Sequence, residues 1–514
     1  MSRGKIAVIG AGPGGLAAAM LLSGNGYDVT VYEMQQTIGG RTSRLELGDY
    51  RFDLGPTFFM MPHLLEEIFQ SVGRSLYDYV TMIDLDPLYR LQFGDTDFRP
   101  TRNQEEMVDR IEMLFPGNGA GYRRFMREEE EKFRRVSPLL QRPFRKPWDY
   151  VARDVLAALP KLHATDSVYN RLSRYFTDER LIYSFTFQAK YLGMSPWECP
   201  GTFTILSFLE HRYGLHHPVG GVNRICHAMA QVIAEYGGVI HTSTPVERVL
   251  IRNGEAVGVE LPDGERREYD HVVINADFAT AMNTLFQPGD LKKFAPSKLA
   301  EKKYSCSTYM LYLGVNRKVS LPHHTILFAD DYRSNVKDIM SNGALSSDAS
   351  VYVHNPAAND PTLAPEGKSA LYVLMPVPNM TASIDWRDKE ATVRESVLAR
   401  LERLPELAGL SGDIEVEASL TPAGWRDQYG VYRGATFNLA HSLDQMMMLR
   451  PHNQFDELRN CWLVGGGTHP GSGLPTIFES ARISAGLLMK QDRETASRLR
   501  RGWRLTEEGK GARA

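Results

Sequence analysis

Glycines near the start of the chain have the spacing of a phosphate-binding turn. Gly10, Gly12 and Gly15 form G-x-G-x-x-G, with Gly14 inside it, directly after the apolar run at residues 6–9. The first glycine permits a tight turn, the second lets backbone approach a pyrophosphate, and the third lets the next helix pack closely on the sheet. That helix presents its N-terminal amides to the phosphates. The stretch therefore predicts a dinucleotide site.

An acid and a second pair of glycines extend this pattern. Glu33 ends a predicted strand at residues 28–32 and follows Gly15 by 18 residues, a spacing typical of the acid that binds a ribose. An ordinary βαβ unit with a solvent-facing Glu33 is the alternative interpretation. Gly40, which follows Gly39, brings backbone near the phosphates again, and Arg41 can bind them through charge-assisted hydrogen bonds.

Two further signatures give the chain a family resemblance. Residues 52–57 (F-D-L-G-P-T) with a following Met-Pro, and residues 465–475 (G-G-G-T-H-P-G-S-G-L-P), resemble the bacterial carotenoid desaturases, namely the phytoene and diapophytoene (dehydrosqualene) desaturases. The resemblance spans residues 5–490, and one departure is Gly466, where the family frequently has Ala. These desaturases lie within the flavin amine oxidase-like superfamily, so the resemblance implies an FAD cofactor.

The resemblance also implies which residues bind FAD. Val246 would hold the adenine through its backbone, and glycines near the C-terminus would let a flat ring approach the backbone. The implied FAD-binding residues are Gly10, Gly12, Gly14, Gly15, Glu33, Gly40, Arg41, Gly55, Pro56, Thr57, Val246, Gly466, Gly467, Thr468, Gly473 and Pro475. His469 either hydrogen-bonds near the flavin ring or supports the loop.

The elements that must position these residues indicate an α/β fold. We expect a Rossmann-type FAD-binding domain, as in two-dinucleotide-binding-domain flavoproteins, intertwined with a mixed α+β substrate domain that has a helical, membrane-facing or tunnel-lining part. A meander is expected at residues 246–251, 256–260 and 268–274. We expect the FAD-binding domain to comprise residues 1–75, 216–290 and 455–492. The helical region is expected at residues 100–215, the substrate-binding sheet domain at 291–454 and a basic tail at 493–514.

A loop rich in cations and aromatic residues, 142–150, interrupts the helical region. In the family that the chain resembles, the matching region lies along the substrate tunnel and supplies an acid proposed to assist proton loss. Asp149 occupies that position, and a helix-capping role is the alternative. Residues 181–209 are dense in apolar side chains, which is typical of a plain core or of a wall for an apolar ligand.

Composition excludes several classes of function. The net charge of −3 argues against a nucleic-acid-binding protein, and no apolar run reaches the length of a transmembrane helix. The four cysteines form no C-x-x-C and the histidines no H-E-x-x-H, so no metal site is predicted. With no signal peptide at the start, we expect a cytoplasmic protein associated peripherally with the cytoplasmic membrane, with the basic tail lying on that surface or disordered.

The resemblance implies an FAD-dependent desaturase of a linear C30 or C40 isoprenoid. Hydride transfer to flavin N5 would be followed by proton loss to Asp149 or to the flavin, and oxygen or a quinone would reoxidise the cofactor. Three alternatives remain open: a carotenoid isomerase or diapocarotenoid terminal oxidase on the same scaffold, a flavin amine oxidase, and a non-enzymatic prenyl-binding protein similar to the Rab GDP-dissociation inhibitors.

Overall fold

A five-stranded parallel sheet forms the centre of the part that contains the first glycine turn. The computed structural model describes residues 3–511, with side chains for all of these except 191 and 495–511. The strands follow the order β19-β13-β1-β2-β9. Their bounds are Lys5–Ile9 (β1), Asp28–Tyr32 (β2), Val239–His241 (β9), His271–Ile274 (β13) and Cys461–Leu463 (β19).

The two faces of this sheet are covered differently. Ile6 and Val8 of β1 face the helices α1 (Pro13–Gly24), α9 (Asn223–Glu235) and α15 (Leu474–Gly511), with which they form one apolar core. Ala7 and Ile9 point to the opposite face and pack with an antiparallel meander. The meander strands are β10 (Arg248–Arg252), β11 (Glu255–Glu260) and β12 (Arg266–Glu268).

The predicted strand at residues 268–274 is wrong as a single element. β12 ends at Glu268 and β13 begins at His271, and the two belong to different sheets. The Tyr269 amide donates to Val257 in the meander, whereas the Asp270 amide donates to Lys5 in the parallel sheet. The backbone hydrogen bonds change partner here, and alternation of side chains along the sequence does not record such a change.

A seven-stranded sheet forms a second layer, with the order β18-β14-β17-β16-β15-β6-β7. One face packs on helix α13 (Trp386–Leu401), and the other packs on α14 (Pro422–Tyr429) and the hairpin β3–β4. The strand bounds, with those of the two small ladders, are Arg44–Leu47 (β3), Tyr50–Asp53 (β4), Met82–Asp84 (β5), Arg90–Phe93 (β6), Thr96–Phe98 (β7), His216–Pro218 (β8), Ser307–Val315 (β14), His324–Leu327 (β15), Val351–His354 (β16), Ser369–Val377 (β17) and Ile414–Leu420 (β18).

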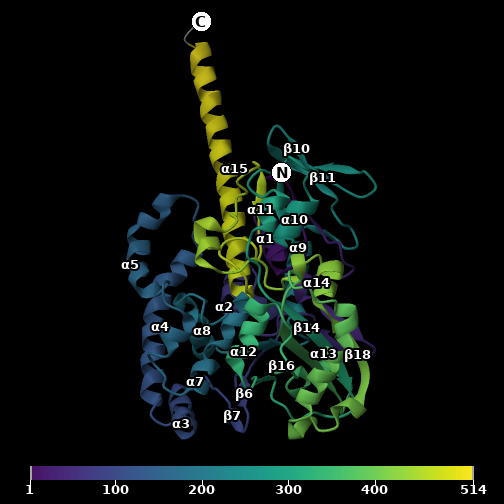
Figure 1. Ribbon diagram of the computed structural model, residues 1–514. Helices are drawn as coiled ribbons and strands as arrows, with labels where there is room; N and C mark the ends of the chain where they lie inside the picture. The colour runs from purple at the N-terminus through teal and green to yellow at the C-terminus, as the bar shows by residue number, and fades with distance from the viewer. Residues whose placement is uncertain (1–2, 512–514) are drawn as a thin grey trace.

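Helices gather on one side of the second sheet, and Figure 1 shows α3, α4, α5, α7 and α8 together at the left of the molecule. The remaining helices have the bounds Pro62–Ser71 (α2), Gln104–Leu114 (α3), Gly119–Leu140 (α4), Arg153–Leu162 (α5), Val168–Leu172 (α6), Glu179–Ser184 (α7), Ile205–Tyr213 (α8), Phe278–Thr284 (α10), Pro296–Ala300 (α11) and Tyr332–Lys337 (α12). Within residues 3–511, no helix combines the length and apolar character needed to cross a bilayer.

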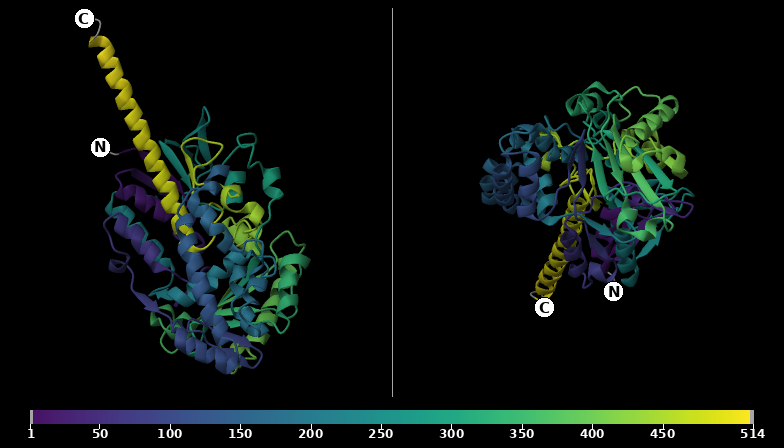
Figure 2. Two further views of the ribbon diagram at one scale, coloured as in Figure 1. Left: turned by 90° about the vertical axis from the view of Figure 1, so that its left-hand side faces the viewer. Right: turned by 90° about the horizontal axis from the view of Figure 1, so that it is seen from below.

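Helix α15 is much longer than the other helices. It begins at Leu474, continues to Gly511 and extends away from the body of the protein (Figures 1 and 2). The predicted basic tail at 493–514 falls largely outside the described side chains, so its placement on a membrane surface stays a prediction.

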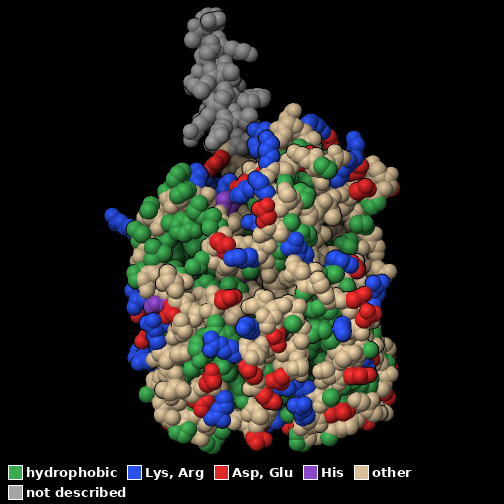
Figure 3. Space-filling view, viewed as in Figure 1, with side chains coloured by type: hydrophobic (Ala, Val, Ile, Leu, Met, Phe, Trp, Pro, Cys, Tyr) green, Lys and Arg blue, Asp and Glu red, His purple; other side chains and the backbone are tan. Residues whose placement is uncertain are grey.

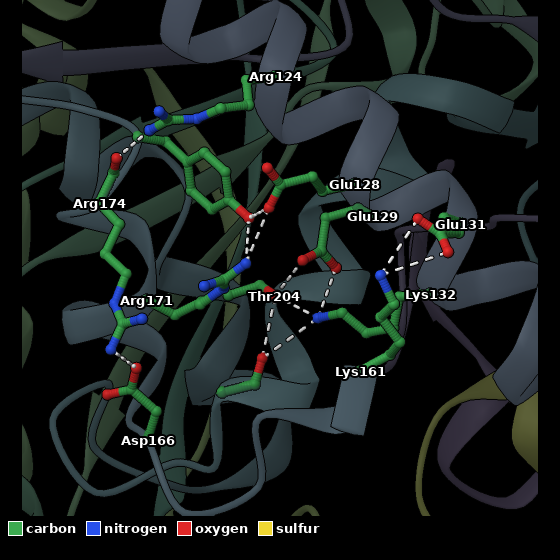
Figure 4. A network of polar contacts seen from close by, with 12 residues as sticks. Arg124, Glu128, Glu129, Glu131, Lys132, Lys161, Asp166, Arg171, Arg174 and Thr204 are labelled. Atoms are coloured by element: carbon green, nitrogen blue, oxygen red, sulfur yellow. Dashed lines mark hydrogen bonds and ion pairs between the residues drawn. The ribbon is translucent and has the colours of Figure 1, made fainter. Parts of the chain in front are cut away.

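A buried ion pair within α4 is linked through Thr204 to the start of α8 (Figure 4). Lys132 Nζ lies 2.7 Å from Glu129 Oε2, and both side chains are at most 2% exposed. Thr204 Oγ1 lies 2.8 Å from Lys132 Nζ and donates to Glu129 Oε1 at 2.9 Å. Removing one member of such a pair leaves a buried charge without its partner, which is strongly destabilising.

We therefore expect Lys132→Met to lower the free energy of unfolding by about 3–5 kcal/mol, measured by urea denaturation. Lys161→Met is the matched control. Lys161 pairs with Glu131, which lies in α4 as Glu129 does, but the side chains of Lys161 and Glu131 are both exposed. That variant should unfold close to wild type, since exposed pairs contribute little. An equal loss in both variants would contradict a special role for the buried pair.

Candidate cofactor and substrate cavity

One large cavity lies between the parallel sheet, the second sheet and the helical region. Its polar end is lined by predicted FAD-binding residues: Gly10, Gly12, Gly14, Glu33, Gly40, Arg41, Gly55, Pro56, Thr57, Val246, Gly466, Gly473 and Pro475. Its other end is apolar and is lined by Met60, Phe187, Leu192, Leu206, Ile326 and Phe328.

Three predicted cofactor residues, Gly15, Gly467 and Thr468, lie behind the lining among the described residues. A Cβ at Gly15 would stand 2.2 Å from the Gly10 carbonyl oxygen, so only glycine lets the two backbone segments approach. Gly10 itself has φ of +97°, which favours glycine. Gly15 thus supports the turn that Gly12 and Gly14 present to the cavity.

Glu33 holds this turn as well as facing the cavity. Its Oε2 accepts a hydrogen bond of 2.7 Å from the Ala11 amide, and its Oε1 accepts one of 2.9 Å from the Gln35 amide. Burial raises the pKa of the Glu33 carboxyl, and the backbone hydrogen bonds oppose that rise. The carboxylate is therefore fixed in orientation at the end of β2, where a ribose hydroxyl could reach it.

Arg41 is held by a second polar network across the cavity. Its Nη1 lies 3.3 Å from Asp277 Oδ2, which also accepts a 2.8 Å hydrogen bond from Asn438. Asn275, two residues before Asp277, donates to the Gly10 carbonyl at 3.2 Å. The segment after β13 thus fixes both the first glycine turn and the arginine.

The wall at residues 55–57 is anchored by tyrosines of the second sheet. Tyr372 donates its hydroxyl hydrogen to the Gly55 carbonyl at 2.8 Å, and the Tyr352 hydroxyl lies 2.7 Å from Thr57 Oγ1. A Cβ at Gly55 would stand 2.6 Å from the Arg41 carbonyl oxygen. This wall therefore places backbone of residue 55 directly against the segment that carries Arg41.

The C-terminal glycine loop rests on a buried arginine that the sequence analysis missed. Arg450 is 1% exposed and donates to the carbonyl oxygens of Gly466 at 2.5 Å and Thr468 at 3.3 Å. Among the described residues it has no carboxylate partner, and burial lowers its pKa to about 9. No local spacing marks Arg450, because its partners are backbone carbonyl oxygens between 11 residues before it and 18 residues after it.

His469 supports the loop from outside. Its Nε2 lies 2.9 Å from the Arg142 carbonyl oxygen, an atom that can only accept, so Nε2 carries the hydrogen. Burial lowers the pKa of His469 to about 4, and the imidazole is neutral at physiological pH. The sequence left two roles open for His469, a hydrogen bond near the flavin ring and support of the loop, and the geometry favours support of the loop.

Asp149 lies in the turn at 147–151 and is not among the residues that line the cavity in the described part of the chain. Its Oδ2 accepts hydrogen bonds of 2.8 Å from the amides of Arg145 and Lys146. These bonds lower the pKa of the Asp149 carboxyl, which is engaged as a capping group. The catalytic role stays a prediction that this geometry does not support.

Lys190 is the second functional candidate that the sequence analysis missed. It lines the apolar part of the cavity, is 8% exposed, and has no carboxylate partner among the described residues. Burial lowers its pKa to about 8. The sequence did contain a signal for this residue, because Lys190 is the one lysine in the mainly apolar stretch 187–192. Burying a charged side chain costs free energy, so such a lysine is expected to have a partner or a function.

Comparisons with known proteins agree with this geometry. A family model described as flavin containing amine oxidoreductase matches residues 13–489. A 4,4'-diapophytoene desaturase (4,4'-diapolycopene-forming) of Methylomonas sp is 48% identical, covering 95% of this chain and 96% of its own. A zeta-carotene-forming phytoene desaturase of Myxococcus xanthus is 40% identical, covering 94% of both chains.

A solved structure shares the fold. An oxidoreductase from Methanosarcina mazei aligns with a TM-score of 0.61 at 19% identity, covering 95% of this chain and all of that chain. At that identity the likeness concerns the fold alone. The predicted α/β class, with a Rossmann-type FAD domain and a mixed substrate domain, is confirmed.

Neighbouring glycines of the C-terminal loop should differ in their tolerance of alanine. A Cβ at Gly467 would lie 2.5 Å from Phe278 Cβ and 2.8 Å from Asn438 Oδ1, which would disturb the partner of Asp277. At Gly466 the nearest atom is the Ser472 hydroxyl at 2.9 Å, and a hydroxyl can rotate away. We expect Gly467→Ala to lose most of its bound FAD and Gly466→Ala to keep it.

The measurement is the ratio of flavin to protein absorbance after gel filtration, with far-UV circular dichroism to check folding. Full FAD occupancy in Gly467→Ala would show that this approach does not govern cofactor binding.

Proposed function

The chain belongs to the carotenoid desaturase family of flavin-containing amine oxidoreductases, and we propose that it introduces conjugated double bonds into a linear C30 or C40 carotenoid precursor. It is an FAD-dependent oxidoreductase acting on CH–CH groups. The observation that carries the proposal is the single cavity, whose dinucleotide end continues into an apolar end. We place a C30 substrate first, because the diapophytoene desaturase is the more similar of the two relatives compared.

Bound FAD supplies the chemistry of hydride acceptance, and the protein supplies position and environment. The glycine turns and Arg41 would hold the phosphates, and residues 55–57 would border the flavin. Apolar side chains around Phe187 and Phe328 bind a polyene and exclude water. A linear hydrocarbon offers no group for ionic recognition, so shape and apolar contact must align the carbon pair that is oxidised.

Positive potential surrounds the place where electron density would arrive. The N-terminal end of α15 follows the glycine loop and carries the positive end of the helix dipole. Arg450 lies behind the same loop with only backbone carbonyls as partners. Both charges are fixed before the reaction, so they stabilise the developing negative charge with little reorganisation.

Lys190 is the proton acceptor in this proposal. It is the amine on the apolar part of the cavity, and burial favours its neutral form, which has a free lone pair. A carbon next to a developing allylic cation is strongly acidic, so an amine is a sufficient base. One hydrogen leaves with two electrons as hydride, the second leaves as a proton to Nζ, and the two carbons form a double bond.

The rate of anaerobic flavin reduction by substrate should rise with pH and level off above about pH 8. Burial lowers the Lys190 pKa from its ordinary value, so the neutral amine predominates only above that pH. Lys190→Met should slow reduction by about 100-fold and remove this pH dependence, because general-base catalysis contributes on that scale. Stopped-flow flavin absorbance gives the rate.

Asp149→Asn is the matched control, and it should keep most of the wild-type rate, since the carboxylate binds two amides outside the cavity lining. A large loss in Asp149→Asn with an unchanged Lys190→Met would reverse the two assignments.

Peripheral membrane association completes the proposal, because such substrates dissolve in bilayers. An apolar patch covers α5, the turn before it and the 443–449 segment, and it appears as the green area at the upper left of Figure 3. Each of its large apolar side chains is 45–64% exposed: Trp148, Val151, Leu156, Leu159, Leu443 and Leu449. Lys146 and Arg153 flank the patch and suit an anionic bilayer.

We expect the triple variant Trp148→Ser, Leu156→Ser, Leu159→Ser to bind anionic phospholipid vesicles at least about 10-fold more weakly in cosedimentation, since three apolar groups no longer enter the interface. Met113→Ser is the control, because Met113 is 73% exposed but lies on α3, outside the patch. Equal binding by all three proteins would remove this surface from the proposal.

Expression in cells that make either dehydrosqualene or phytoene, followed by pigment chromatography, tests the function directly. We expect coloured polyenes from the C30 strain. Unchanged double-bond number with altered geometry would indicate the isomerase alternative, and oxygenated ends would indicate the terminal oxidase. Peroxide release with amines and no coloured product would favour an amine oxidase. Reoxidation of the purified protein by oxygen or by a quinone then identifies the electron acceptor.

A further inference from the structure

Three buried histidines from separate segments meet beside the second sheet, outside the cavity lining. His217 lies in β8, His323 directly precedes β15, and His354 ends β16. The ring centroid of His323 lies 4.6 Å from that of His217 and 4.7 Å from that of His354. All three side chains are at most 4% exposed. Neither the cofactor site nor the proposed reaction uses them.

Two of these histidines have a ring nitrogen without a partner, and the third shares one. Nδ1 of His217 and Nδ1 of His354 are buried and have no hydrogen-bond partner among the described residues. The Nε2 atoms of His323 and His354 are 3.0 Å apart, and only one hydrogen fits between them. An ion that displaced this hydrogen could bind the Nε2 lone pair of His323.

The remaining nitrogens are oriented as those of metal ligands commonly are. His217 Nε2 donates to Asp360 Oδ2 at 2.9 Å, and His323 Nδ1 lies 3.1 Å from Asn359 Oδ1. A carboxylate or amide oxygen that accepts from one ring nitrogen fixes the tautomer and turns the other nitrogen toward an ion. The two partners are neighbours in one turn after β16.

Two buried carboxyl groups lie beside the cluster. Asp360 is fully buried and accepts hydrogen bonds from His217 Nε2, Thr362 Oγ1 and the Gly220 amide. Asp53 is 4% exposed and accepts a hydrogen bond from the Val222 amide. In the described part of the chain, neither carboxyl forms an ion pair with lysine or arginine. A cation bound by the histidines would therefore lie in favourable surroundings.

We propose that His217, His323 and His354 bind one Zn²⁺ ion. One ring nitrogen of each lies within 4.8 Å of those of the other two. Zinc–nitrogen bonds of about 2.0–2.1 Å in a tetrahedron place the nitrogens about 3.3 Å apart, so an inward movement of at most about 1.5 Å closes the site. Neutral imidazoles are suited to zinc, and water fills the fourth position.

The ion would join three segments that border the cavity. β8 leads through residues 219–222 into α9, whose Asn223 donates to the carbonyls of Ile38 and Thr42 beside Arg41. β15 and β16 carry Ile326 and Tyr352, which line the cavity. The ion would hold these segments together from outside the cavity lining, and the proposal does not depend on the proposed function.

The test uses the full chain with FAD, purified without a histidine tag and without chelator. Inductively coupled plasma mass spectrometry should find about one zinc per chain. Dialysis against a chelator should lower the melting temperature, and added Zn²⁺ should restore it. Asp360→Asn should weaken zinc binding about 10–100-fold, because the orienting carboxylate is lost.

His323→Gln and His354→Gln should lose the zinc, whereas His227→Gln, an exposed histidine on α9, should retain it. If the cluster variants fail to fold, chelation and zinc addition in the wild-type protein still decide. A wild-type protein without zinc whose melting temperature does not respond to added Zn²⁺ overturns the proposal. So does zinc retained at wild-type level in both cluster variants. Either result would assign the cluster to hydrogen bonding alone.

Discussion

The structure depends on close approach of backbone segments within the protein at several places around one cavity. Gly10 and Gly15 meet with no room for a side chain, Gly55 lies against the Arg41 carbonyl, and Gly467 packs on Phe278. These contacts come from segments far apart in the chain, so the parallel sheet must bring them together before any of them can act. Asn275 joins them, because it donates to the Gly10 carbonyl and borders Gly14 and Gly465.

The second requirement is an apolar space beside this charged one. The seven-stranded sheet supplies the anchor through Tyr352 and Tyr372, and the helical region supplies Phe187 and Leu206. Lys132 and Glu129 of the helical region are buried and paired with one another away from the cavity. Lys190 is the lysine that this region places in the otherwise apolar lining.

Local spacing was enough to predict the glycine turns, Glu33 and the C-terminal loop, because each is a short motif whose geometry is set within a few residues. The break between β12 and β13 could not be predicted from the sequence, because it depends on which sheet the amides of Tyr269 and Asp270 join. Arg450 and the histidine cluster were missed for a similar reason. Their partners lie at long separations or are backbone atoms, and no spacing rule describes His217, His323 and His354 together.

The position of Arg450 also has a consequence for the amount of intact protein in a cell. The Arg450 guanidinium is enclosed by carbonyl oxygens and has no carboxylate partner in the described part of the chain, so its positive charge is only partly compensated by the protein. Electron-rich oxygens of a flavin would relieve that imbalance, so prosthetic group and polypeptide stabilise each other. The amount of intact protein should then follow the supply of the vitamin from which the flavin is made, and scarcity of that nutrient would act on the protein as a destabilising mutation does.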